Sequence, residues 1–298
     1  MSKPAKIGKA NPTHMIADPI SPSLSFQPWQ GSVHLLYTVR QGKTLPQRSY
    51  AQAPLKLQRP LYPEGEEICH SILVHTAGGM AAGDSLETTV GMEPGSRALV
   101  TTAAANKIYR STGETAQQIT HLSLSPSTCL EWFPQETIVF SGAQFHQQTR
   151  VDLAPGAIWV GWDITRFGRS ARGETLQQGH WRSHLEVWQS GIPLWCDRQF
   201  LQGGSDVLTS PHGLNGHPVI ATLALLGWNP TADHLEAIRA LWHSSGGEVG
   251  VTRLQQGLLC RYRGPSSQLA RRWFGAVWEQ LRPDYLNRPA CFPRAWAI

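Results

Sequence analysis

From Ser32 onward, the chain consists of short segments in which apolar and polar residues alternate. In the clearest of them, Val33, Leu35, Tyr37 and Val39 occupy every second position. An alternation of period two is typical of a strand that is buried on one face. Further alternating, β-branched or aromatic runs occupy residues 117–124, 147–153, 157–164, 185–188 and 219–226. Because turn-forming Pro-Gly and Ser-Gly pairs separate these runs, the pattern predicts a mostly β, layered fold.

Two helices are predicted in the C-terminal third. Pro230-Thr231 opens the first, which we expect to end near Gly246-Gly247. Its apolar face is expected to consist of Leu235, Ile238, Leu241 and Trp242.

The second helix is expected to begin at Ser266 or Ser267, either of which is a suitable N-cap residue. Its apolar residues recur every four positions, at Leu269, Trp273, Val277 and Leu281. Pro283 is expected to stop it.

The domain organisation is simple. Residues 1–30 are rich in Pro, Ser and Lys and lack periodicity, which predicts a flexible N-terminal arm. Residues 31–298 show neither a strict repeat nor a linker, and are predicted to form a single β-rich domain.

The amino-acid composition limits the classes of function that this chain can have. Charged residues make up only 16% of the chain, against about 25% in typical soluble domains. Together with twelve tryptophans, this indicates a surface that partner proteins cover. The net charge is +5, but the basic residues are scattered, so nucleic-acid binding is not favoured. Five dispersed cysteines and the lack of a long apolar stretch predict a cytoplasmic protein without a membrane segment.

The segment 75–84 is glycine-rich, with Gly78, Gly79 and Gly83 ahead of Asp84. It lacks the spacing of a phosphate-binding loop. The simplest interpretation is a tight structural turn that Asp84 caps.

The segment 101–111 begins with small residues and ends with Lys107, Tyr109 and Arg110. This pattern predicts a packed stretch followed by a basic turn, and by itself specifies no chemistry.

The segment 130–140 places two carboxylates, Glu131 and Glu136, around Pro134-Gln135 in an apolar and aromatic stretch. A buried carboxylate is costly unless it is paired, hydrogen-bonded or in contact with a hydrated cavity. Two interpretations stay open: the pair faces solvent or arginines, or it lines a polar channel.

The segment 168–174 sets Glu174 beside two arginines, Arg169 and Arg172, after Gly168. Its spacing does not match a nucleophile elbow, and an arginine–carboxylate pair is the simplest interpretation. Histidines are numerous, but even His180 and His184 lack an obvious third ligand for a tight metal site. No catalytic group of residues can be assembled from spacing.

Taken in order, these motifs resemble those of the UreD/UreH family of urease accessory proteins. Residues 78–84 resemble its Gly-Gly-x-x-Gly-Gly-Asp motif, with Ala82 in place of a glycine. Residues 101–111 resemble Thr-Thr-Gln-Ala-Ala-x-Lys-x-Tyr-Arg-Ser, with Ala103 in place of Gln, and residues 130–138 resemble Leu-Glu-x-x-Pro-Gln-Glu-Thr-Ile. Residues 168–174 and several C-terminal segments also match, so the resemblance covers about residues 30–297.

The resemblance implies an elongated, β-helix-like stack of strands with two helices. It further implies a non-catalytic protein without a tightly bound cofactor, which acts with UreF and the GTPase UreG on apo-urease. UreE would be the nickel donor upstream, and Ni²⁺ would meet this chain only transiently.

A passage for Ni²⁺ must let the ion enter and leave, and carboxylates hold it less tightly than imidazoles or thiolates do. The hypothesised route is lined by Asp84, Glu131, Glu136, Asp163 and Glu174. Two alternatives to this function are a small-molecule hydrolase that uses Glu131 or Glu136, and a nucleic-acid binder.

Overall fold

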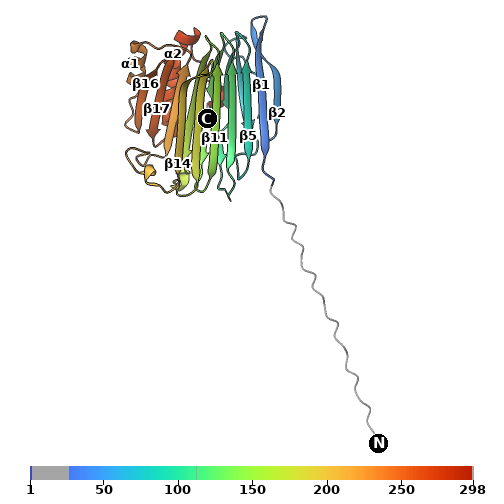
Figure 1. Ribbon diagram of the computed structural model, residues 1–298, viewed down its shortest axis with the longest axis vertical. Coiled ribbons are helices and arrows are strands. Elements are labelled where there is room, and N and C mark those ends of the chain that lie inside the picture. The colour runs from blue at the N-terminus through green and yellow to red at the C-terminus, as the bar shows by residue number, and fades with distance from the viewer. Residues whose placement is uncertain (2–26, 112, 297–298) are drawn as a thin grey trace.

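The computed structural model describes Met1, residues 27–111 and residues 113–296. The arm predicted for residues 1–30 therefore lies mostly outside the described residues. Two large β-sheets, here called sheet A and sheet B, form the framework of the described chain (Figure 1).

The seven strands of sheet A are, in their order across the sheet, β14 (Ile192–Gln202), β13 (His180–Gln189), β11 (Gln144–Leu153), β8 (Ala116–Leu124), β5 (Ser85–Met92), β1 (Gln30–Arg40) and β2 (Lys43–Gln52). The main path of sheet B is β16 (Glu248–Leu254), β17 (Gly257–Gly264), β15 (Val219–Leu226), β12 (Ile158–Phe167), β9 (Cys129–Phe133), β6 (Arg97–Thr102), β4 (Ile68–His75) and β3 (Leu55–Leu57).

Between β4 and β13 the chain passes back and forth between the two sheets. In sheet B, β4, β6, β9 and β12 are parallel neighbours. In sheet A, β5, β8, β11 and β13 are parallel neighbours too. The result is a β-solenoid of about four turns, which confirms the predicted β-helix-like stack.

A third, shorter ladder forms one corner of the solenoid. It consists of β7 (Asn106–Ile108), β10 (Thr137–Val139) and the end of β12, all parallel. Met80, Ile108, Val139 and Phe167 are successive partners along this ladder, and none is more than 2% exposed. They recur at roughly 30-residue intervals, a spacing typical of solenoid repeats. The sequence alone shows no strict repeat because the stacked positions share apolar character but not residue type.

Antiparallel strands close both ends of the stack. β2 and β3 pair antiparallel with β1 and β4 at one end. At the other end β14 pairs with β13, and β15, β17 and β16 follow β12. Edge strands keep backbone groups that no neighbour pairs, so both ends offer positions where a further chain could bind.

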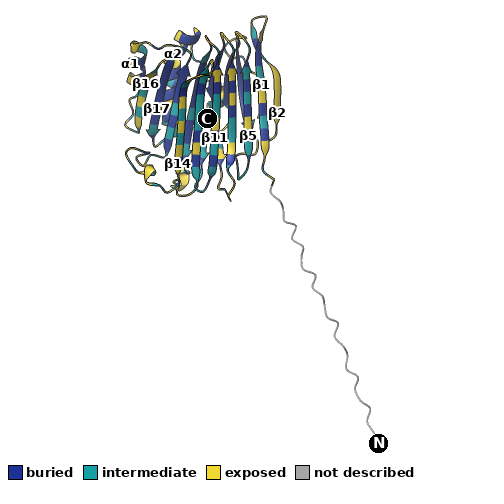
Figure 2. Ribbon diagram, in the orientation of Figure 1, coloured by how far each residue is buried: buried dark blue, intermediate teal, exposed yellow. Residues whose placement is uncertain are grey.

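The main core lies between the two sheets. In β1, Val33, Leu35 and Tyr37 point inward and are at most 3% exposed, whereas His34 is exposed. Figure 2 shows how burial changes from residue to residue along the strands. Val39 departs from the pattern because it lies next to the β1–β2 turn, where it is 38% exposed. All six strand segments predicted from the sequence are strands, and most extend further than the alternating residues.

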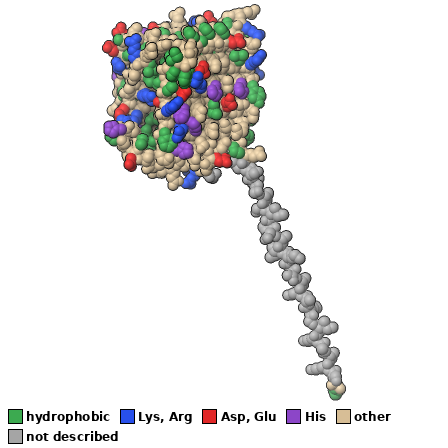
Figure 3. Space-filling model, viewed as in Figure 1, with side chains coloured by type: hydrophobic (Ala, Val, Ile, Leu, Met, Phe, Trp, Pro, Cys, Tyr) green, Lys and Arg blue, Asp and Glu red, His purple; other side chains and the backbone are tan. Residues whose placement is uncertain are grey.

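Two helices cover the outer face of sheet B and enclose a second core with it. α1 (Ala232–Ala240) begins at the N-cap Thr231 and ends before the glycines that were expected to stop it. α2 (Ser267–Leu286) has Ser266 as its N-cap, as predicted. The outer face of sheet A carries mixed histidine, charged and apolar side chains (Figure 3).

The prediction that Pro283 stops the second helix is wrong. α2 continues to Leu286 and ends at Asn287, which has a left-handed conformation and donates to the carbonyl of Pro283 at 3.0 Å. Proline in a helix interior costs about 3 kcal/mol. Burial of Tyr285 and Leu286, together with the buried contacts of Arg282, offsets this cost.

Within the described part of the chain, no helix has the length and apolar character that crossing a membrane requires.

Candidate functional site at the stacked corner and the interior cavity

Three of the motifs found in the sequence meet at the stacked corner. One residue past Ile108 and one past Val139, the rings of Tyr109 and Phe140 meet edge to face at a centroid distance of 5.3 Å. Arg169, two residues past Phe167, places its guanidinium 4.7 Å from the centroid of the Phe140 ring. With Arg110, Ser141 and Glu174 they line a surface pocket of about 480 Å³. The motifs are far apart in the sequence, but the solenoid places them in neighbouring turns.

Glu174 is held firmly in this pocket. It accepts hydrogen bonds from the guanidinium and backbone N–H of Arg169 and from the backbone N–H of Ser141. These bonds, chiefly those from Arg169, lower the pKa of Glu174. The arginine pairing expected as the simplest interpretation is therefore present.

Gly168 is the residue of this motif that tolerates substitution least. It has a φ of +81°, and a Cβ atom there would overlap the carbonyl oxygen of Glu174. We predict that Gly168→Ala lowers the free energy of unfolding by about 2–4 kcal/mol. Gly156, with a φ of +76° and open space around it, is the matched control. Gly156→Ala should cost about 1–2 kcal/mol in the same denaturant titration.

Equal losses in the two variants would show that the close approach of Glu174 to Gly168 adds nothing to the cost of the left-handed backbone.

The glycine-rich turn supports the same corner. The backbone of Met80 exchanges hydrogen bonds with Lys107 and Tyr109 at 2.7 and 2.8 Å, and the Tyr109 hydroxyl donates to the carbonyl of Gly78 at 3.3 Å. A Cβ atom at Gly79 would lie 2.5 Å from the Tyr109 ring. Gly83 has a φ of +76°, whereas Ala82 is not among the described residues with a positive φ, so its side chain causes no strain there.

Asp84 caps this turn, as the simplest interpretation of the sequence expects. It is 3% exposed and accepts hydrogen bonds from the backbone N–H groups of Trp29 and Ala81, both at 2.7 Å.

An interior cavity of about 190 Å³ lies between the two sheets. Polar side chains from both sheets line it, together with apolar and aromatic ones. The polar set comprises His75, Thr88, Thr102, Asn106, Lys107, Gln118, Thr120, Gln135, Thr137, Gln147, Thr149, Asp163 and Ser183. The indole N–H of Trp159 and the amide oxygen of Asn106 also belong to lining residues, and neither has a hydrogen-bond partner among the described residues. Buried polar atoms of this kind are usually satisfied by water.

Asp163 is the one carboxylate among the described residues that line this cavity. It accepts hydrogen bonds from the Gln147 amide and, at 3.3 Å, from the Thr165 hydroxyl. Gln147 also donates to Ser183 at 3.0 Å. Burial raises the pKa of Asp163 to about 6, although the bonds from Gln147 and Thr165 oppose the shift. Asp163 therefore titrates closer to neutral pH than an exposed aspartate does.

Glu131 lies outside the cavity, in a buried ionic cluster that joins α2 to sheet B. It is 1% exposed and accepts hydrogen bonds from Trp278, Arg282 and Tyr285 at 2.6–3.0 Å. Arg282 also binds Glu64 at 2.6 and 2.8 Å. Burial opposes the charge on Arg282, but its contacts with Glu64 and Glu131 outweigh this and raise its pKa. The arrangement is that of a structural support.

Glu136 also contacts α2, where it pairs with Arg271 and lies 3.5 Å from the hydroxyl of Ser267. Both carboxylates of the 130–140 motif are thus paired with arginines, one of the two interpretations left open by the sequence. Between them, Pro134 accepts a hydrogen bond from the Trp162 indole at 2.7 Å. Gln135 donates from its backbone to Thr102 at 2.8 Å and from its amide to the carbonyl of Ala295 at 3.3 Å.

The five carboxylates of the hypothesised route do not form one row. Asp163 faces the cavity, Glu174 lines the surface pocket, Asp84 caps a turn, and Glu131 and Glu136 contact α2. The sequence reasoning missed Gln147 and Ser183. Their inward direction could have been found from the alternation of β11 and β13, in which both occupy positions that point toward the core.

No group of three or more His, Cys, Asp and Glu side chains in the described ranges could hold a metal ion. His146 and His184 approach to a ring-centroid distance of 5.0 Å on the outer face of sheet A, and no third ligand joins them there among the described residues.

The fold and the site define a two-sheet β-solenoid with a stacked apolar corner and a polar interior cavity, in which Asp163 is the one carboxylate among the described lining residues. The family model for "UreD urease accessory protein" matches residues 30–297. The chain belongs to the UreD family of urease accessory proteins.

Individual relatives agree with the family match. The chain is 53% identical over 270 residues to the urease accessory protein UreD of Nostoc punctiforme, covering 91% of this chain and 96% of that protein. It is 53% identical over 272 residues to UreD of Acaryochloris marina, with the same coverage. UreD of Methylobacillus flagellatus is 41% identical over 268 residues, covering 90% of this chain and 94% of that protein.

Proposed function

We propose that this protein is a non-catalytic scaffold of urease maturation in the cytoplasm. In this proposal it binds apo-urease together with UreF and UreG and helps deliver Ni²⁺ to the urease active site. Its membership of a family of urease accessory proteins supports a role in urease maturation.

The observation that carries the nickel part of the proposal is the position of Asp163. Its carboxylate faces an interior cavity between amide and hydroxyl groups, which are weak ligands for Ni²⁺. Such a site attracts a divalent cation without holding it as tightly as imidazoles or thiolates would. Ni²⁺ is cargo in this account, and loose coordination lets it leave as well as enter.

The raised pKa of Asp163 fits this role. A carboxylate with a pKa of about 6 is mostly ionised near neutral pH and can attract a cation, and a proton that binds at a slightly lower pH favours release of that cation. Asp84, Glu131, Glu136 and Glu174 stay candidates for the route, but arginines or backbone N–H groups hold them, whereas the donors to Asp163 are a neutral amide and a hydroxyl.

A small-molecule hydrolase is the second candidate, and the raised pKa of Asp163 in a cavity is the observation that favours it. Hydrolysis by acid and base catalysis usually requires two positioned groups. Glu131 and Glu136, the carboxylates first considered for this role, point to arginines on α2. The hydrolase therefore has less support than the scaffold.

A tagged pull-down from a host that makes urease tests the proposal. We expect urease subunits, UreF and UreG among the bound proteins identified by mass spectrometry, in amounts comparable to the bait. An unrelated tagged protein of similar charge is the control. Recovery of the bait without urease subunits, in cells with active urease, would contradict the scaffold and favour the hydrolase.

A further inference from the structure

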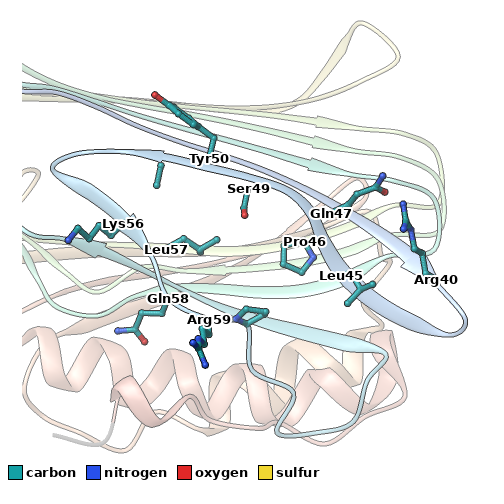
Figure 4. Close-up of a pocket in the computed structure, with 12 residues that line it drawn as sticks. Arg40, Leu45, Pro46, Gln47, Ser49, Tyr50, Lys56, Leu57, Gln58 and Arg59 are labelled. Carbon is teal, nitrogen blue, oxygen red and sulfur yellow. The ribbon is translucent and has the colours of Figure 1, made fainter.

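Both sheets end on the same side of the molecule, sheet A in β2 and sheet B in β3, and a groove lies between the two edges. Its volume is about 700 Å³. Figure 4 shows the arrangement: Pro46 and Ser49 extend from β2 toward the strand that carries Leu57. The groove lies apart from the interior cavity and from the surface pocket at the stacked corner, because it shares no lining residue with either of them.

The groove has an apolar floor with basic residues around it. Leu45, Pro46 and Leu57 are half-buried, which leaves apolar surface for a ligand to cover. Arg40, Lys56 and Arg59 are exposed along the same groove.

The charge of the lining has one sign. Among the described residues, no Asp or Glu lines the groove and none forms an ion pair with its three basic residues. Elsewhere basic residues do find partners, as Lys43 does with Glu66 at 2.7 Å and Arg288 with Glu67 at 2.7 Å. The groove therefore carries a local positive field that no neighbouring acid neutralises.

Protection against edge-to-edge pairing explains part of this composition. Proline and lysine on an edge strand discourage pairing with another sheet, and Pro46 and Lys56 fit that purpose. Protection does not require a groove, an apolar floor or the two arginines at its ends.

We propose that this groove binds an acidic, extended segment of a partner protein. Carboxylates of the segment would face Arg40, Lys56 and Arg59, and its apolar side chains would cover Leu45, Pro46 and Leu57. Residues 2–26 of the chain itself are poorly suited as the occupant, because they contain Lys3, Lys6 and Lys9 but only one acid, Asp18. The proposal adds a partner-binding site to the scaffold function. It rests on that function in one respect, which is that the partner belongs to the same assembly.

Fluorescence anisotropy with the full-length chain tests this binding. The probe is a fluorescein-labelled ten-residue peptide of alternating Glu and Val, and a peptide of alternating Lys and Val controls for apolar binding. The test variant combines Arg40→Glu, Lys56→Glu and Arg59→Glu. The matched control combines Arg172→Glu, Arg253→Glu and Arg272→Glu, three exposed arginines outside the groove with the same total change of charge.

We expect the acidic peptide to bind the unmodified chain and the control variant within about twofold of each other, and the test variant at least about tenfold more weakly. Raising the salt concentration should weaken the binding, because the charges are exposed. Circular dichroism of both variants checks that they fold.

Three results would overturn the proposal: no binding of the acidic peptide to the unmodified chain, equal weakening in both variants, or tighter binding of a DNA duplex at the same groove. The assay contains no urease, so its failure would leave the nickel-delivery proposal standing. Conversely, failure to recover urease in the pull-down would leave a groove-dependent peptide affinity intact.

Discussion

Replacing Arg282 with alanine is expected to lower the free energy of unfolding by about 3–5 kcal/mol. The guanidinium is fully buried and donates to both Glu131 and Glu64. Without it, the buried carboxylate of Glu131 would have only the donors of Trp278 and Tyr285. The loss should appear in equilibrium denaturant unfolding as a lower midpoint.

Arg272, an exposed residue on the same helix, provides the control. Arg272→Ala should change the free energy of unfolding by less than about 0.5 kcal/mol. Adding Glu131→Gln to Arg282→Ala should recover part of the loss, because it removes the stranded charge. If Arg282→Ala costs no more than Arg272→Ala, the cluster does not hold α2 in place.

Replacing Asp163 with asparagine is expected to lower nickel delivery to urease on the order of tenfold, while it makes the protein more stable above pH 6. Asparagine keeps an acceptor for Gln147 but removes the negative charge. Because the folded-state pKa of Asp163 is raised to about 6, its contribution to stability is full below the unfolded pKa and is lost as the pH rises through 6. At pH 7.5 the substitution should therefore stabilise the fold by about 1–2 kcal/mol.

The two readouts move in opposite directions, which separates a role in transport from a structural one. Nickel is measured in urease purified from cells that carry the variant, and stability in the isolated variant at pH 5 and 7.5. Ser123→Ala, on an exposed position of β8, is the control and should change neither. A fall in both stability and nickel content would assign Asp163 a structural role instead.

Local patterns predicted much of the fold. The alternation of Val33, Leu35 and Tyr37 identified a strand, and the four-residue spacing of Trp273, Val277 and Leu281 identified the buried face of α2. Both patterns depend on which side of a single element is buried, and neighbouring residues record that directly. The end of α2 was not predicted, because the burial that carries it past Pro283 comes from contacts with β9.

Long-range arrangement was harder to predict. Glu131 was identified as a carboxylate in an apolar stretch whose surroundings stayed open, because its partner Arg282 lies 151 residues away and has no local signal. The stacking of Met80, Ile108, Val139 and Phe167 was missed for a similar reason, since a solenoid corner requires apolar residues without fixing their type.

For the candidate site too, the local motifs were predicted but their arrangement in space was not. The motifs around Tyr109, Phe140 and Arg169 were found in the sequence, but their meeting at one surface pocket follows from the solenoid path. Of the five carboxylates proposed together, Asp163 alone faces the interior cavity. Sequence reasoning identified acids in apolar surroundings, and could not tell those that bind arginine from the one that lines a cavity.

The nickel content of urease tests the central claim most directly. Urease would be purified from a host in which the gene for this chain is deleted, and from the same host with the gene restored, at equal nickel supply. We predict that the deletion yields folded urease with little nickel and that restoration returns the metal. Urease with a full complement of nickel from the deletion host would contradict the account.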